Sequence, residues 1–110
     1  MKNIVVQKFG GTSLGSIERI KAVANTIKKT SLNEFPIIVV SAMSGETDKL
    51  INLAKDISDA PAERELDALL STGEKVSAAL LAMTLQSLGL QAKSFSAAQI
   101  LSLIHISEPT

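Results

Sequence analysis

Two short apolar segments in the first half of the chain have the pattern of buried β-strands. Residues 4–9 are rich in β-branched side chains and end at a pair of glycines. Residues 36–42 are apolar without polar alternation, which is typical of a strand covered on both faces in a parallel sheet. Residues 91–96 predict a third strand.

A helical period separates the first two strands. Residues 16–29 place apolar side chains at spacings of three and four, so that these side chains share one face of a helix. The side chains are Ile17, Ile20, Val23, Ala24 and Ile27. Ser16 is the expected N-cap, and Glu18 lies in the first turn, where the helix dipole favours an acidic side chain.

Three further helices are predicted between the second and third strands, at residues 47–58, 61–72 and 74–88. Pro61 suits the first turn of the middle helix, and Gly89 ends the last one. The resulting order β-α-β-α-α-α-β predicts an α/β fold whose mainly parallel sheet is joined by right-handed crossovers.

Composition narrows the class of protein. The chain has 110 residues, of which 45% are hydrophobic, and this is about the size of one small domain. Its 11 basic and 11 acidic residues balance, so charge gives no reason to expect a nucleic-acid partner. The absence of cysteine excludes disulfides and thiolate metal sites. A cytoplasmic protein fits this absence of cysteine. We expect no membrane span and no signal peptide.

A lysine, two glycines and two hydroxyl side chains follow one another closely where the first strand ends. They are Lys8, Gly10, Gly11, Thr12 and Ser13. A strand, a glycine turn and a helix together leave backbone N–H groups free at a helix N-terminus, which favours an anion such as phosphate. The alternative is an ordinary turn with an exposed lysine. The spacing fits neither the P-loop nor the dinucleotide-binding glycine motif.

Hydroxyl side chains also gather after the second strand, in the sequence SAMSGETD (residues 41–48). Ser41, Ser44 and Thr47 offer ligand-binding groups there, because ligands bind at the carboxyl ends of parallel strands. The alternative is that Thr47 or Asp48 caps the following helix.

A third polar segment, STGEKVS (residues 71–77), is expected to begin the last helix. Ser71 or Thr72 would cap this helix, Gly73 would open it, and Glu74 would lie in its first turn. The alternative role for Glu74 is to stabilise the helix dipole.

Taken together, the three segments resemble the aspartate kinases, which are members of the amino acid kinase superfamily. The resemblance rests on KFGGTS, VVSAMSGETDKLINLA and ERELDALLSTGEKVSAALLAM, which occur in the family's order over residues 2–100. It implies a three-layer α/β/α fold with a mainly parallel sheet, as in carbamate kinase. Residues 1–100 would be the N-terminal part of a truncated kinase domain.

The resemblance also implies a reaction, in which the γ-phosphoryl group of ATP passes to the β-carboxylate of L-aspartate. The product, 4-phospho-L-aspartate, begins lysine, threonine, methionine and diaminopimelate synthesis. Because the attacking carboxylate is ionised at neutral pH, catalysis needs positioning and charge stabilisation rather than a general base. Mg²⁺ is expected to accompany ATP without a dedicated protein site, and the parent enzyme is expected to be a homo-oligomer.

Site residues are carried over from the resemblance in two groups. The ATP site would contain Lys8, Phe9, Gly10, Gly11 and Ser13, with Lys8 as the catalytic charge. The aspartate site would contain Ser41, Thr47 and Glu74.

Two features depart from the family. Ala98 stands where the family usually has a glycine, and residues 101–110 do not resemble the family. We expect this tail to be a sequencing or assembly artefact, and the chain by itself to be inactive. The alternatives are another kinase of the superfamily, acting on a carboxylate, a carbamate or a nucleotide phosphate, and a non-catalytic fragment.

Overall fold

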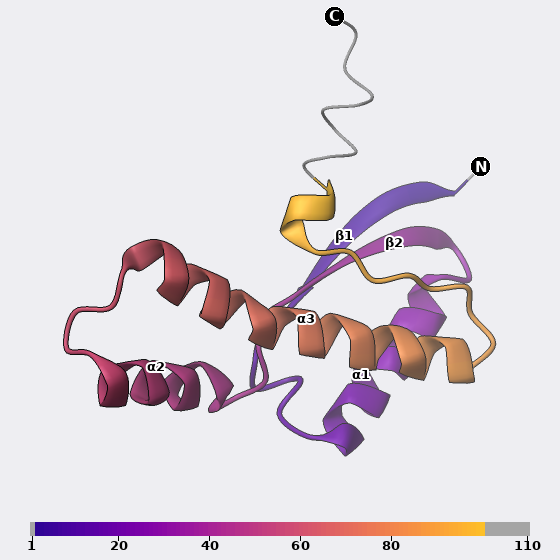
Figure 1. Cartoon of the computed structure of the whole chain (residues 1–110). Helices are drawn as coiled ribbons and strands as arrows, with labels where there is room; N and C mark the ends of the chain where they lie inside the picture. The colour runs from indigo at the N-terminus through magenta and orange to yellow at the C-terminus, as the bar shows by residue number, and fades with distance from the viewer. Residues whose placement is uncertain (1, 101–110) are drawn as a thin grey trace, which may run out of the picture.

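The computed structural model of the chain describes residues 2–100, and its elements follow the order β1, α1, β2, α2, α3 (Figure 1). The strands β1 (Asn3–Phe9) and β2 (Glu34–Val40) pair in parallel, with Phe9 beside Val40. The helix α1 (Ile17–Thr30) connects them. The predicted α/β fold with a parallel sheet is therefore confirmed.

The first helix begins as its sequence predicts. The Ser16 hydroxyl accepts a hydrogen bond from the backbone N–H of Arg19 at 3.2 Å, which confirms the N-cap. Four of the five expected apolar side chains are buried, namely Ile20, Val23, Ala24 and Ile27. The fifth, Ile17, is 54% exposed. It lies at the first helical position, at the margin of the face that packs.

The later helices differ from the prediction in one respect. The helix α2 (Glu46–Ile57) matches the expected helix closely, but α3 (Glu63–Ser87) is one continuous helix of 25 residues. The sequence predicts two helices separated near Gly73, and this break is wrong. Gly73 is buried inside α3, so neither Ser71 nor Thr72 acts as a cap.

The third predicted strand is also wrong. Residues 90–96 have no regular secondary structure, and the sheet formed by the described residues has two strands. The segment is attached through side chains instead: Leu90 and Ala92 pack against the core, and the Gln86 side chain donates a hydrogen bond to the Ala92 carbonyl at 2.9 Å. The predicted tail at 101–110 lies outside the described residues.

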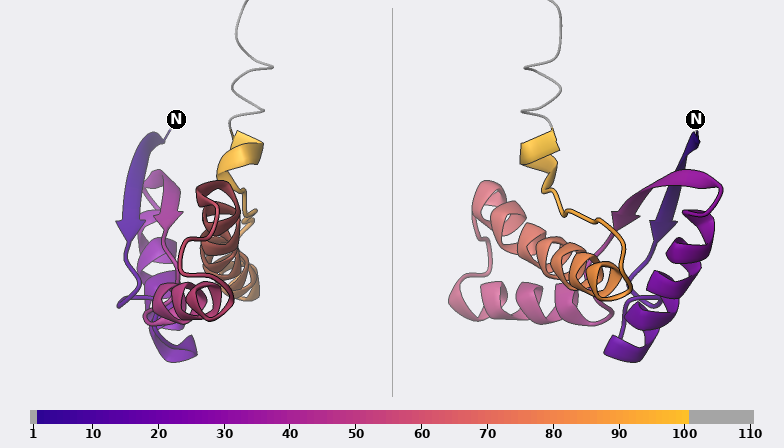
Figure 2. Two further views of the ribbon diagram at one scale, coloured as in Figure 1. Left: turned by 60° about the vertical axis from the view of Figure 1, so that its left-hand side comes forward. Right: turned by 90° about the vertical axis from the view of Figure 1, so that its right-hand side faces the viewer.

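Helices α1 and α3 pack against one face of the sheet, whereas α2 packs against α3. Phe9, Ile38 and Val40 pack against a core formed by Leu14 and by buried side chains of α1 and α3. The left view of Figure 2 shows α3 beside the strands, on one side of them. The opposite face is apolar and exposed, with exposed fractions of 44% to 68% for Ile4, Val6, Phe35, Ile37 and Val39. A second helical layer of the expected three-layer fold would cover this face.

Candidate functional site

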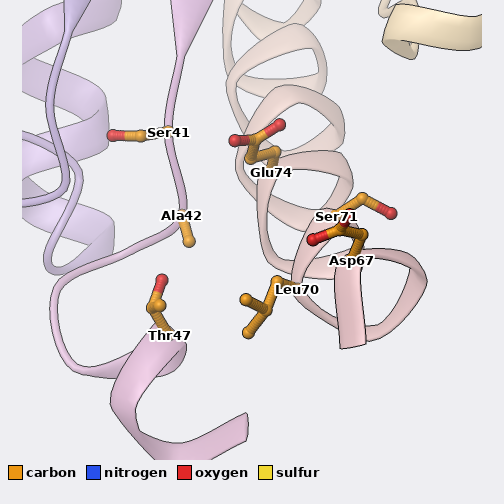
Figure 3. A pocket seen from close by; sticks show the side chains of 7 residues that line it. All are labelled: Ser41, Ala42, Thr47, Asp67, Leu70, Ser71 and Glu74. Atoms are coloured by element: carbon orange, nitrogen blue, oxygen red, sulfur yellow. The ribbon is translucent and has the colours of Figure 1, made fainter. Parts of the chain in front are cut away.

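A cavity of about 310 Å³ lies between the end of β2, the start of α2 and one face of α3 (Figure 3). It is lined by Ser41, Ala42, Thr47, Asp67, Leu70, Ser71 and Glu74. The three residues expected to bind aspartate therefore line one cavity, although they come from three different parts of the chain.

The β2 side of the cavity is formed by a turn. The backbone N–H of Ser41 donates to the Phe9 carbonyl at 3.4 Å, so the pairing of the strands continues one residue beyond β2. Gly45 has a φ of +87°, a left-handed conformation that favours glycine, and it turns the chain into α2. Thr47 then lies in the first turn of α2, and Figure 3 shows its hydroxyl directed toward Ala42.

The opposite wall is one stripe of α3. Asp67, Leu70, Ser71 and Glu74 are spaced by three and four residues, which places them on one side of the helix. In Figure 3 a carboxylate oxygen of Asp67 and one of Glu74 are directed across the cavity. The Ser71 hydroxyl points away and donates to the Ala68 carbonyl at 2.9 Å. The charges of this wall are therefore those of two carboxylates.

The two walls together favour a small polar ligand with a positive group. Thr47 supplies a hydroxyl opposite Asp67 and Glu74, and neither lysine nor arginine lines the cavity. The Ser41 hydroxyl points away from α3 in Figure 3, so Ser41 lines the cavity without directing its oxygen into it. An ammonium group between the walls would be attracted by the carboxylates.

The glycine turn after β1 makes several backbone hydrogen bonds through its carbonyl groups. The carbonyl of Gly11 accepts hydrogen bonds from the backbone N–H groups of Leu14, at 3.2 Å, and Ser44, at 3.1 Å. Within the part of the chain that the structure describes, the backbone N–H groups of Gly11, Thr12 and Ser13 donate to no other protein group. The carbonyl of Gly11 therefore accepts hydrogen bonds within the protein, while the N–H groups of Gly11, Thr12 and Ser13 remain available to a ligand.

Two glycines lie so close to Ala42 that neither has space for a side chain. A Cβ atom at Gly11 would lie 2.7 Å from the carbonyl oxygen of Ala42, and a Cβ atom at Gly73 would lie 2.8 Å from the Cβ atom of Ala42. Real Cβ atoms essentially never approach other atoms so closely. The glycine turn, the end of β2 and α3 therefore meet at Ala42, which is 9% exposed.

The residues expected at the ATP site are spread more widely. Lys8 is exposed near the end of β1, while the side chain of Phe9 packs against the core. Gly10 follows in an open position, where a Cβ atom would meet no other atom within 4 Å. Ser13 lines a second cavity of about 320 Å³ beside α1, together with Thr12, Arg19, Ala22 and Val23. None of these side chains lines the cavity that contains Glu74.

Besides Ala42, three lining residues that lie on α3 were not predicted as site residues from the sequence, namely Asp67, Leu70 and Ser71. Their spacing from Glu74 was visible, but it places them on the same face only if the helix continues through Gly73. Among residues 2–100 there is no group of three or more acidic or histidine side chains that could hold a metal ion. No helix in the same range is long and apolar enough to cross a membrane.

The sequence model of the amino acid kinase family matches residues 3–108. The chain therefore belongs to the amino acid kinase family. The sequence analysis places the end of the kinase-like part at residue 100, and the matched range runs beyond that residue. This division of the chain stays a prediction.

Two similar proteins are both aspartate kinases. The aspartokinase of Geobacillus stearothermophilus is 57% identical over 94 residues, covering 84% of this chain and 23% of the relative. The aspartate kinase of Pseudomonas putida is 53% identical over 98 residues, covering 88% of this chain and 24% of the relative. The chain thus spans about a quarter of the length of these relatives.

A solved structure shows the same fold. The aspartate kinase from Synechocystis superimposes with a TM-score of 0.76 and 55% identity, over 77% of this chain and 15% of the Synechocystis chain. The arrangement of the strands and helices described above is therefore also found in a solved aspartate kinase.

Proposed function

We propose that this chain is the aspartate-binding part of an aspartate kinase, which transfers the γ-phosphoryl group of ATP to the β-carboxylate of L-aspartate. The observation that carries the proposal is that Ser41, Thr47 and Glu74 line one cavity. The product, 4-phospho-L-aspartate, would enter lysine, threonine and methionine synthesis. The names of the relatives support the same reaction.

The cavity suits L-aspartate in size and charge. A volume of about 310 Å³ is at the small end of the range for ligand pockets, about 300–1,000 Å³. The Glu74 carboxylate would attract the α-ammonium group of aspartate, and the Thr47 hydroxyl would donate to one of its carboxylates. Neither residue needs to move a proton in this role.

Phosphoryl transfer would depend on the glycine turn and Lys8. A β-carboxylate oxygen attacks the γ-phosphorus, the bond from this phosphorus to the bridging oxygen breaks, and ADP leaves with the electron pair. The backbone N–H groups of Gly11, Thr12 and Ser13 are available for phosphate oxygens, and the Lys8 ammonium would stabilise the charge that develops. No general base is required, because the nucleophile is already ionised.

Magnesium has no evident site among the described residues. The acidic side chains of the cavity, Asp67 and Glu74, lie on one wall, and no group of three acidic or histidine residues occurs between residues 2 and 100. These residues do not fit a metal cage, and the proposed mechanism contains no step through Mg²⁺.

The charge of the cavity also distinguishes the proposal from the other reactions of the superfamily. A carbamate or a nucleotide phosphate is anionic and carries no ammonium group, so the two carboxylates would only repel it. An amino acid carries an ammonium group that these carboxylates attract. The cytoplasmic location and the homo-oligomeric parent enzyme stay predictions.

A chimeric enzyme tests the proposal. In this protein, called the graft below, residues 1–98 of the chain replace the matched segment of the Geobacillus stearothermophilus aspartokinase. We expect ATP-dependent ADP release with L-aspartate and little release with glutamate, carbamate or uridylate. A folded graft that prefers one of the other acceptors, or that uses none of them, would contradict the proposed function.

A further inference from the structure

We propose that the contact between Gly73 and Ala42 sets the width of the substrate cavity, so that these two residues determine the length of the amino acid that it accepts. The inference rests on the proposed function, because it concerns the same cavity. Gly73 does not line the cavity, and its role is to position Glu74, the next residue of α3.

The contact has no space for another carbon atom. A Cβ atom at Gly73 would lie 2.8 Å from the Cβ atom of Ala42, whereas ordinary van der Waals contact begins at 3.4 Å. A separation of 3.4 Å in place of 2.8 Å requires a displacement of about 0.6 Å. Either α3 or the segment that contains Ala42 must therefore move when residue 73 has a side chain.

The segment that contains Ala42 is tied to the rest of the protein by backbone hydrogen bonds on both sides of this residue. Just before Ala42, the Ser41 N–H donates to the Phe9 carbonyl at 3.4 Å. The hydrogen bond from the Ser44 N–H to the Gly11 carbonyl, at 3.1 Å, fastens the same segment to the glycine turn. The Ala42 segment is thus tied to the end of β1 and to the glycine turn.

Helix α3 would therefore move, and it would carry one wall of the cavity with it. Glu74 and Asp67 belong to the same continuous helix as Gly73. Ser77, one turn further along, is completely buried, so the close packing of α3 extends over two turns. A displacement at Gly73 would move the two carboxylates away from Thr47 and widen the cavity.

Cavity width matters because aspartate and glutamate differ by one methylene group. One methylene is worth about 10- to 200-fold in kcat/KM when a pocket fits the shorter or longer substrate closely. A wider cavity would hold aspartate less firmly and would admit glutamate more readily. Gly73 and Ala42 would then act as specificity-determining residues, with Gly73 acting only through the position of α3.

Exchanging the methyl group between the two positions tests this inference. In the graft, Gly73→Ala should raise the KM for aspartate and lower the preference for aspartate over glutamate by about tenfold, with little change in the KM for ATP. Gly73→Ala combined with Ala42→Gly removes the clash, and should restore the preference to within about threefold of the unsubstituted graft. Lys75→Ala, at an exposed neighbouring position of α3, should change neither value.

The outcomes separate this inference from the proposed function. An unsubstituted graft that is folded but inactive with aspartate overturns the proposed function and the inference together. An active graft whose preference is unchanged by Gly73→Ala, or is not restored by the exchange, overturns the inference alone. An exchanged variant that fails to fold also overturns it, because the number of atoms at the contact is unchanged.

Discussion

The backbone N–H of Ser44 donates a hydrogen bond to the carbonyl of Gly11 at 3.1 Å, across the gap between the glycine turn and the loop after β2. The two segments are separated by the whole of α1 and β2 in the sequence. The bond therefore joins the side of the site that we assign to ATP with the side that we assign to aspartate. Residues on either side of it should respond differently to substitution.

Gly11→Ala should destabilise the graft, whereas Gly10→Ala should not. A Cβ atom at Gly11 would lie 2.7 Å from the backbone carbonyl of Ala42, but a Cβ atom at Gly10 would meet nothing within 4 Å. Overpacking costs about 1–3 kcal/mol, and Gly11→Ala should lower the thermal midpoint accordingly. Equal midpoints for the two variants would show that the close approach does not exist in solution.

Gly73→Ala should also destabilise the graft, although it replaces a helical glycine with the best helix former. Helix propensity alone favours alanine by about 1 kcal/mol. The 2.8 Å approach to the Ala42 methyl group acts in the opposite direction and should exceed this gain, with a cost of about 1–3 kcal/mol. Thr72→Ala, at the exposed preceding position, provides the control and should leave the thermal midpoint unchanged or raise it. A higher midpoint for Gly73→Ala would contradict the prediction.

Lys8→Ala should lower kcat of the graft by about 100- to 1,000-fold, because removing one preorganised donor to a developing charge has an effect of this size. Its side chain is exposed, so the far-UV circular dichroism and the thermal midpoint should not change. Lys21→Ala, at an exposed position of α1, should retain normal turnover. Near-normal kcat in Lys8→Ala would show that Lys8 is not the catalytic charge.

Glu74→Gln and Thr47→Val should each raise the KM for aspartate by about tenfold or more, since a hydrogen bond to a charged group contributes about 1.5–3 kcal/mol. The KM for ATP should change little, because neither residue belongs to the glycine turn. Glu65→Gln, in the first turn of the same helix, is the matched control for loss of a carboxylate. Weakened ATP binding with normal aspartate binding would reverse the assignment.

The 110-residue chain alone should associate with itself and should show no aspartate-dependent ADP release. Val6 and Ile37, at 64% and 45% exposure, belong to the apolar sheet face that no described helix covers. Such a surface promotes aggregation. Combining Val6→Thr with Ile37→Thr should reduce association in sedimentation velocity while preserving the helical circular dichroism signal. A chain that stays monomeric at all concentrations would contradict this prediction, as would one that phosphorylates aspartate.

The sequence predicted well those elements whose apolar periodicity and end signals lie within their own residues. The N-cap at Ser16 and the apolar spacing of α1 are both contained within one helix. The continuity of α3 depends on a distant residue, because a helical glycine is unfavourable by itself and Gly73 is accommodated by packing against Ala42. Ser71 and Thr72 look like caps in sequence, but their hydroxyls bond to the carbonyls of Ala68 and Leu69 within the helix.

Only part of the candidate site could be predicted from the sequence. Ser41, Thr47 and Glu74 came from the resemblance, and the structure brings them to one cavity. Asp67 was missed because a break at Gly73 removes the helical relation between Asp67 and Glu74. The prediction of a strand at 91–96 was also wrong because the outcome depends on distant residues. A strand needs a partner strand, and a short sequence of mixed polarity does not specify such a partner.

The Arg19 guanidinium donates to the Thr12 carbonyl at 2.8 Å, and the backbone N–H of Gly15 donates to the same carbonyl at 3.3 Å. These bonds, with those to Gly11, hold the glycine turn in one conformation that depends on α1 and on the loop after β2. The entropy of ordering the turn is therefore lost when the chain folds and not when a phosphate binds. If the turn binds the phosphates of ATP as we propose, it has its binding conformation before the nucleotide arrives, and association should need no loop closure by these residues.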